Sequence, residues 1–155
     1  LRTNSALTTL HLYGNNIGPD GARALADALR SNSTLTALDL GRNNIGVAGA
    51  RALAGMLSNN YALTKLTLSR NNVGDAGAAA IAESLRNNSV LTYLDLDHSN
   101  IGDAGATAFA DVLLTNFAMT YIDLCSNNIA DVVENKIDEL MQTNGEADSR
   151  EEARG

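Results

Sequence analysis

Three side chains that could take part in catalysis or metal binding fall close together when the sequence is aligned on its own repeat. Cys125 lies one 28-residue period after Asp97, and His98 follows Asp97 directly. A thiol, an imidazole and a carboxylate are the groups that build nucleophilic and metal-binding sites. Consecutive residues of a strand point to opposite sides, however, so Asp97 and His98 diverge unless the strand ends before them. No pattern for a closed pocket or an oxyanion hole accompanies them, and we therefore predict neither catalysis nor a metal site.

The same 28-residue spacing is a property of most of the chain. Leu7, Leu35, Leu63, Leu91 and Met119 each open a copy of the pattern L-x-x-L-x-L-x-x-N-x-I-G-x-x-G-A-x-A-L-A-x-x-L. A fixed period of this size indicates a solenoid, because each unit can bury its apolar side only against its neighbours. The sequence therefore predicts one continuous array of about five 28-residue repeats.

Each copy predicts one short strand and one helix. In the first copy, Leu10 and Leu12 alternate with other residues, as in a strand that buries one face. Apolar residues then recur at helical spacing from about Asp20 to Arg30. The connection is a right-handed crossover, so successive strands are parallel. Strands pack about 4.8 Å apart and helices about 8–10 Å apart, so the strands line a concave side and the helices a convex side.

An asparagine marks the corner where the chain leaves each predicted strand. Asn15, Asn43, Asn71 and Asn127 hold this position, and Ser99 replaces the asparagine in the fourth copy. An asparagine amide can satisfy backbone groups that a turn leaves unpaired. We therefore expect a stacked, hydrogen-bonded ladder of corners, with a weaker or water-bridged rung at Ser99.

This pattern resembles the ribonuclease-inhibitor class of leucine-rich repeats. It is similar to the repeat regions of NOD-like receptors and of Ran GTPase-activating proteins, and the likeness covers residues 1–144. The resemblance implies a horseshoe-shaped α/β solenoid whose concave face and strand-end loops bind other proteins. It is specific for the fold and poorly specific for the function.

The two ends of the chain depart from the pattern. Residues 1–6 match the last turn of a copy, so we expect them to be the end of a truncated preceding repeat. Residues 119–144 form a C-terminal repeat that we interpret as a cap, because larger or charged residues replace small ones on its helix. These residues are Ala130, Val133, Glu134, Lys136 and Asp138. Residues 145–155 are predicted to be an acidic, disordered tail.

Composition narrows the classes of partner. Of the net charge of −7, residues 1–130 carry −2 and residues 131–155 carry −5, so no basic patch suggests nucleic acid. No apolar run approaches the roughly 18 residues of a membrane span. No P-loop, paired-cysteine zinc spacing or HExxH motif occurs, so we expect no cofactor. A single cysteine favours a reducing compartment, and we predict a cytoplasmic protein.

The candidate partner-binding residues are non-leucine residues of the predicted strands and their exits, because these point out of the concave sheet. They are Tyr13, Arg42, Lys65, Arg70, Tyr93, Asp95, Asp97, Tyr121 and Asp123. Tyrosine and arginine are common anchors of protein interfaces. Asp95 and Asp123 would stand opposite each other as like charges, an unfavourable pair that favours a cationic ligand or partner.

We interpret the chain as a non-enzymatic protein–protein interaction module and a fragment of a larger receptor, effector or regulator. The alternative is a GTPase-activating regulator resembling the Ran-activating proteins, with which the acidic end agrees. A third hypothesis is self-association through an N-terminal face that no preceding repeat covers. That face would expose Leu1, Leu7, Leu12, Ile17 and Leu25.

Overall fold

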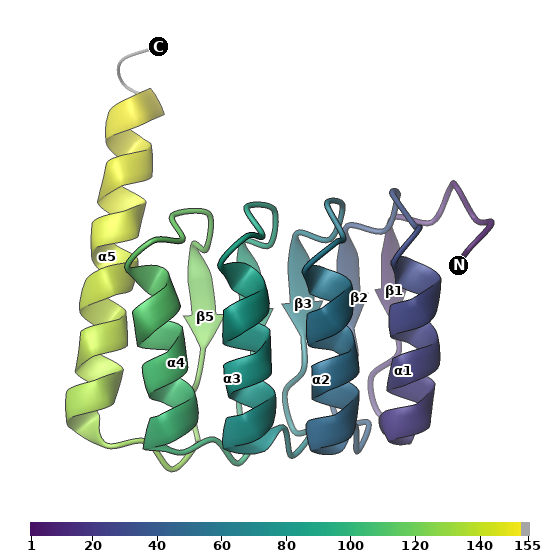
Figure 1. Cartoon of the computed structure of the whole chain (residues 1–155), viewed down its shortest axis with the longest axis horizontal. Helices are drawn as coiled ribbons and strands as arrows, with labels where there is room; N and C mark the ends of the chain where they lie inside the picture. The colour runs from purple at the N-terminus through teal and green to yellow at the C-terminus, as the bar shows by residue number, and fades with distance from the viewer. Residues whose placement is uncertain (153–155) are drawn as a thin grey trace.

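Strands and helices alternate along the chain and lie in two layers. The computed structural model describes the backbone of residues 1–152 and the side chains of residues 1–144. Figure 1 shows the helices as one row of near-parallel rods in front of a row of strands. In chain order the elements are β1 (Thr9–His11), α1 (Gly18–Leu29), β2 (Ala37–Asp39), α2 (Gly46–Leu57), β3 (Lys65–Thr67), α3 (Gly74–Leu85), β4 (Tyr93–Asp95), α4 (Asp103–Leu113), β5 (Tyr121–Asp123) and α5 (Asp131–Glu152).

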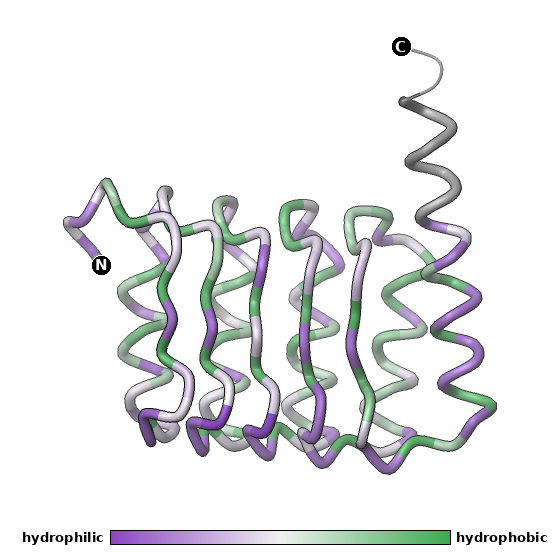
Figure 2. The backbone as a smooth tube through the Cα atoms, turned by 180° about the vertical axis from the view of Figure 1, so that it is seen from behind, coloured by the Kyte–Doolittle hydropathy of each residue, from purple (hydrophilic) through white to green (hydrophobic). Residues whose placement is uncertain are grey.

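The five strands form one parallel sheet in the order β1-β2-β3-β4-β5. The register keeps the 28-residue period throughout, so that Leu10, Leu38, Leu66, Leu94 and Ile122 stand side by side. Figure 2 shows the strand layer from behind, with hydrophobic and hydrophilic residues alternating along the strands. The predicted right-handed α/β solenoid, with strands on the concave side and helices on the convex side, is confirmed.

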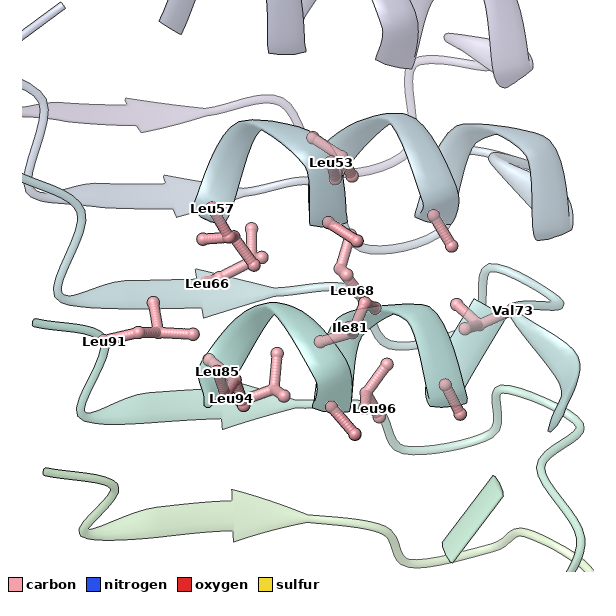
Figure 3. Close-up of a cluster of buried hydrophobic side chains, with 14 of the residues drawn as sticks. Leu53, Leu57, Leu66, Leu68, Val73, Ile81, Leu85, Leu91, Leu94 and Leu96 are labelled. Carbon is pink, nitrogen blue, oxygen red and sulfur yellow. The ribbon is translucent and has the colours of Figure 1, made fainter. Parts of the chain in front are cut away.

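The core lies between the two layers. Figure 3 shows leucines of the strand layer, such as Leu66 and Leu68, meeting Leu53 and Leu57 of α2. Leu38, Leu66 and Leu94 are almost completely buried. Small residues let the helices approach closely: a Cβ added to Gly49 would lie 3.0 Å from the Cβ of Ala22. Successive repeats therefore share one apolar interior.

Each of the first three helices begins earlier than its apolar spacing indicates. The helix α1 starts at Gly18 rather than near Asp20. Gly18, Gly46 and Gly74 have φ angles of 67°, 64° and 63°, a left-handed conformation that glycine adopts without a steric penalty. The glycine that seemed only to break the extended pattern is thus the turn that starts each helix.

The predicted asparagine ladder is present at the strand exits. The amide nitrogen of Asn43 donates to the carbonyl oxygens of Leu12, Leu40 and Gly41, and its Oδ1 accepts from the backbone N–H of Asn15 at 2.8 Å. Asn71 repeats this arrangement one coil later. Each asparagine therefore ties its own corner to the corner before it.

Ser99 forms the weaker rung that the sequence predicts. Its hydroxyl donates to the carbonyl oxygens of Leu68 and Asp97, each at 3.3 Å. Within the described residues, neither the N–H of Asn71 nor that of Val73 donates to Ser99, although the equivalent N–H groups of the preceding copies have an asparagine acceptor. The shorter side chain therefore keeps one bond to the previous coil, to the Leu68 carbonyl, and leaves out the two that an asparagine oxygen would accept.

A second asparagine column, which the sequence analysis did not predict, runs along the opposite corner of the coil. Its buried members are Asn32, Asn60, Asn88, Asn116 and Asn144. In Asn88, the amide nitrogen donates to the carbonyl oxygens of Leu57 and Asn60, and Oδ1 accepts from the N–H groups of Val90 and Leu91. The two donated bonds join the end of this helix to the coil before it, and the two accepted bonds fix the turn that leads into the next strand.

The helix α5 is longer than predicted. It continues to Glu152 and projects past the other helices in Figure 1. The helix takes in residues 145–152, where an acidic, disordered tail was predicted, and residues 153–155 lie outside the described residues. Glutamate, alanine and arginine are good helix formers, and they make up much of this segment. Their helix propensity outweighs the high charge from which disorder was expected.

Within the described residues, no helix combines the length and the apolar character that a membrane crossing requires.

We expect Asn88→Ala to lower the free energy of unfolding by about 2–4 kcal/mol, because one buried N–H group, one partly buried N–H group and two carbonyl groups lose their asparagine partner. Chemical denaturation followed by circular dichroism would measure the loss. Asn87→Ala is the matched control: Asn87 is exposed, and its truncation should change the free energy by less than about 0.5 kcal/mol. Equal effects of the two substitutions would contradict a structural role for the column.

We expect Ser99→Asn to raise the free energy of unfolding by about 1 kcal/mol, because an amide at this corner can restore the missing bonds. The reciprocal change Asn71→Ser should destabilise the protein by a similar or larger amount. Thermal and urea unfolding of both variants would test the pair. A loss of stability in Ser99→Asn would mean that the fourth corner has no room for the larger side chain.

Candidate protein-binding surface

The sheet register brings three of the predicted residues into one row on the concave face. Lys65, Tyr93 and Tyr121 are direct neighbours on β3, β4 and β5. The two tyrosine rings stack with centroids 4.7 Å apart and planes 11° from parallel. The Nζ of Lys65 lies 4.1 Å from the centroid of Tyr93, over the ring. A cation and two aromatic rings thus form a row, in contact ranges that stabilise both kinds of pair.

A second row places carboxylates beside these rings. Asp95 and Asp123 are paired on β4 and β5, as the spacing predicts. Burial raises the pKa of Asp95, while a hydrogen bond from the N–H of Asp97 lowers it; the carboxylates of Asp123 and Asp97 raise it further, against a bond from Ser69. The net result is a raised pKa, so burial first and the facing Asp123 carboxylate second make the charged form of Asp95 unfavourable.

Both tyrosines keep their protons more firmly than free tyrosine does. Burial is the main cause of the raised pKa of Tyr93, and the carboxylate of Asp123 is the main cause for Tyr121. The Tyr121 hydroxyl lies 3.3 Å from Oδ2 of Asp123, to which it donates. The phenols are therefore neutral hydrogen-bond donors that lie next to negative charge.

Asp97 and His98 converge, because the strand ends before them. The strand β4 stops at Asp95, and His98 has a left-handed φ of 49°. Its Nδ1 lies 2.7 Å from both carboxylate oxygens of Asp97. Burial acts to raise the pKa of Asp97, but the bonds from His98 and Ser126 and the charges of His98 and Arg70 outweigh it, so the pKa is lowered.

The thiol of Cys125 is not activated by this pair. Cys125 is exposed, and a hydrogen bond to Asp123 together with the charge of that carboxylate raises the thiol pKa. A raised pKa suppresses the thiolate, which is the nucleophilic and metal-binding form. Among the described residues, no group of three or more histidine, cysteine or acidic side chains is placed to hold a metal ion. The raised pKa therefore disfavours a nucleophilic or metal-binding role for Cys125.

The remaining predicted residues lie at the margin of the concave face. Arg42 and Arg70 are at the strand exits with φ angles of 55° and 58°. Arg70 is near enough to Asp97 for its charge to lower the carboxyl pKa. Tyr13 is 51% exposed and its ring lies over Gly41, on the N-terminal part of the face. Tyr13 and Arg42 therefore do not join the row formed by Lys65, Tyr93 and Tyr121.

The left-handed backbone conformation of the residues that follow the strands was not predicted. Arg42, Arg70, His98 and Ser126 all adopt a conformation that residues other than glycine rarely take. The one available signal was Gly14, which holds the same position in the first copy. This backbone turn is what swings His98 toward Asp97.

The comparisons with known proteins agree with the fold. The Leucine Rich repeat family model matches residues 3–26, 31–54, 60–82 and 87–110, which together make up more than half of the chain. One match falls on each of the first four copies of the 28-residue repeat. A search of curated protein sequences gives no match.

Two solved structures superpose closely on the chain. One is described as leiomodin-1 actin-binding site 2; it has a TM-score of 0.87 and 20% identity, and the alignment covers 97% of this chain and 88% of that one. The other is the tropomodulin C-terminal domain of Caenorhabditis elegans, with a TM-score of 0.85, 13% identity and coverage of 98% and 92%. At these identities the likeness concerns the fold.

We expect Asp95→Asn to stabilise the protein at pH 7 by up to about 1 kcal/mol, because asparagine keeps the acceptor for the Asp97 N–H and removes one of two facing charges. The folded-state pKa of Asp95 is raised above its ordinary value near 3.8. The destabilisation by the Asp95 charge is therefore absent below that value, grows as the pH rises from that value to the folded-state pKa, and is constant above it.

Urea unfolding of parent and variant between pH 3 and pH 7 would show this difference growing with pH. Asp39→Asn is the control in the same row of the sheet, since Asp39 faces His11 and Thr67 rather than a second carboxylate. A pH-independent effect of Asp95→Asn would contradict the electrostatic explanation.

Proposed function

The chain belongs to the leucine-rich repeat family, and on that premise we propose that it is a non-enzymatic module that binds a protein partner through its concave face. The observation that carries this proposal is the row of Lys65, Tyr93 and Tyr121 beside the carboxylates of Asp95 and Asp123. Large aromatic side chains held ready on a rigid sheet are typical anchors of protein interfaces.

The row is suited to binding because it is already ordered. Tyr121 is 44% exposed although Tyr93 covers one side of its ring, so a partner gains contact area on a ring that need not be immobilised. Association is favoured when side chains lose little freedom on binding. The neighbouring carboxylates supply acceptors, and the lowered pKa of Asp97 keeps that group charged.

The fold is suited to a binding scaffold. The structure described as leiomodin-1 actin-binding site 2 is an example in which the same architecture binds a protein. A reducing compartment such as the cytoplasm suits the exposed free thiol of Cys125. No observation on the described residues favours the GTPase-activating alternative or a closer relation to the ribonuclease-inhibitor class, and we do not propose either.

The test is partner capture with the concave double variant Tyr93→Ala/Tyr121→Ala. A partner recovered by the parent protein and then purified should bind the double variant at least about tenfold more weakly, because each tyrosine anchor contributes about 1–2 kcal/mol. Calorimetry or surface-plasmon resonance would measure the dissociation constants. Circular dichroism and thermal unfolding would show that the variant is folded.

Tyr61→Ala is the matched control, because Tyr61 is 70% exposed in the turn before β3 and takes part in neither row. It should leave the dissociation constant within about twofold of the parent, as expected for a residue outside the interface. Unchanged binding by the folded double variant would overturn the proposed surface.

A further inference from the structure

The outer edge of β5 carries backbone groups that have partners in every earlier repeat. At each of the four junctions, a threonine carbonyl accepts from the next strand and a leucine N–H donates to it. At the last junction the Thr92 carbonyl accepts from the Tyr121 N–H, and the Leu96 N–H donates to the Asp123 carbonyl. The equivalent groups on β5 are the Thr120 carbonyl and the Leu124 N–H, and within the described residues they have no hydrogen-bond partner.

A groove runs along this edge between β5 and α5. It has a volume of about 170 Å³, less than the roughly 300 Å³ at the lower end of sites for small molecules. Its walls include the apolar side chains of Ile122, Leu124 and Ile137. Figure 2 shows β5 as the last strand of its row, with α5 beyond it. The space suits side chains of an extended segment better than a compact ligand.

The helix α5 closes the array to a further helix while leaving room for a strand. Glu134 and Asp138 occupy the positions that alanines hold in the earlier helices, and those alanines are nearly or completely buried between neighbouring helices. A carboxylate at these positions obstructs a helix that packs in the same way. Both side chains instead line the groove next to β5.

The charge of the groove specifies a basic occupant. Asp123, Glu134 and Asp138 line it, and none of them forms an ion pair with another described residue. The side chain of Tyr121 also borders it, with Tyr93 stacked on one ring face. Uncompensated carboxylates and an available ring face both attract a lysine or arginine side chain.

The molecule contains a template for such a contact. Lys65 stands on the strand next to Tyr93, in the same row of the sheet, with its ammonium group over the tyrosine ring. A basic residue on a strand next to β5, in the same register, would meet Tyr121 in the same way. The following inward-facing residue would lie beside Ile122, as Leu66 lies beside Leu94.

We propose that an extended, basic segment of a protein partner adds to β5 as a sixth parallel strand, with a lysine or arginine over Tyr121 and an apolar residue in the groove against Ile122 and Ile137. Strand addition supplies affinity through main-chain bonds and specificity through alternate side chains. This inference rests on the proposed function, since it names the chemistry of the partner and extends the concave surface to the sheet edge.

The probe is the capped peptide acetyl-Leu-Thr-Lys-Leu-Lys-Leu-amide. It copies residues 63–68 except for a second lysine in place of the second threonine, so it carries the β3 pattern with a basic residue beside Asp123. Titration into the isotopically labelled protein, followed by two-dimensional NMR, should shift the backbone amides of Leu124 and Ser126 in a saturable manner. Exchanging both lysines of the peptide for glutamate should weaken binding at least about tenfold.

Two N-methylated peptides separate strand pairing from simple charge attraction. In β3, the N–H of Lys65 donates to the preceding strand, while that of Leu68 donates to the following strand. N-methylation of the first lysine of the peptide should therefore weaken binding about tenfold, because it removes an inward bond and introduces a clash. N-methylation of the last leucine, whose N–H faces away, should leave the affinity within about twofold.

A protein variant tests the acidic wall. Glu134→Gln/Asp138→Asn should weaken binding of the lysine peptide about two- to fivefold, as expected for partly exposed ion pairs. Glu139→Gln, on the same helix but facing a different groove, is the control and should change little. Shifts confined to Tyr93 and Lys65, or equal affinities of all four peptides, would overturn strand addition.

Concentration-dependent shifts at Leu124 without peptide would assign the edge to a second copy of the chain and also overturn the proposed occupant.

The proposed concave binding surface and the proposed sixth strand can be contradicted independently of each other. A partner that depends on Tyr93 and Tyr121 while the peptide does not bind leaves the concave surface intact and removes the sixth strand. Peptide binding at β5 combined with partner capture that survives the double tyrosine variant removes the concave surface instead.

Discussion

Buried asparagine side chains tie each repeat to the previous one at both corners of the coil, and the rest of the structure depends on these ties. At the strand exit, Asn43 bonds the carbonyl of Leu12 in the preceding coil, and at the helix end Asn88 does the same with the carbonyl of Leu57. A buried amide with unmet partners is costly, so each contact enforces the 28-residue period. Leucines alone would tolerate a looser stack, since apolar contact is not directional.

The enforced register decides what the concave face presents. Because residues one period apart must stand side by side, the sheet stacks Tyr121 on Tyr93 and also sets Asp123 against Asp95. The first pair is stabilising and the second is not. A sheet free to slip would separate the two carboxylates, whereas one held at both corners retains the unfavourable pair. The concave face can therefore carry residues that suit binding, such as the facing carboxylates, at a small loss of stability.

The sequence predicted the features that follow from the 28-residue period, but it did not predict those that depend on local backbone conformation. The strands, the sheet order, the weak rung at Ser99 and the row of Lys65, Tyr93 and Tyr121 all follow from aligning the copies. The convergence of Asp97 and His98 did not, because it depends on a left-handed φ that histidine does not signal. The second asparagine column was visible at the same spacing but resembled ordinary turn residues, for which asparagine is common.

The helix layer and the strand layer differ in what they present at α5 and β5. In α5, Glu134 and Asp138 stand where alanines pack in the earlier repeats, and a helix packed against them in the same way would bury carboxylates at a cost in free energy. In the strand layer, β5 keeps donors and acceptors arranged as in the four strands before it. Tyr121 and Asp123 belong to both the concave face and this edge. The face and the edge are therefore one continuous surface, and the carboxylates of α5 contribute to the negative charge beside β5.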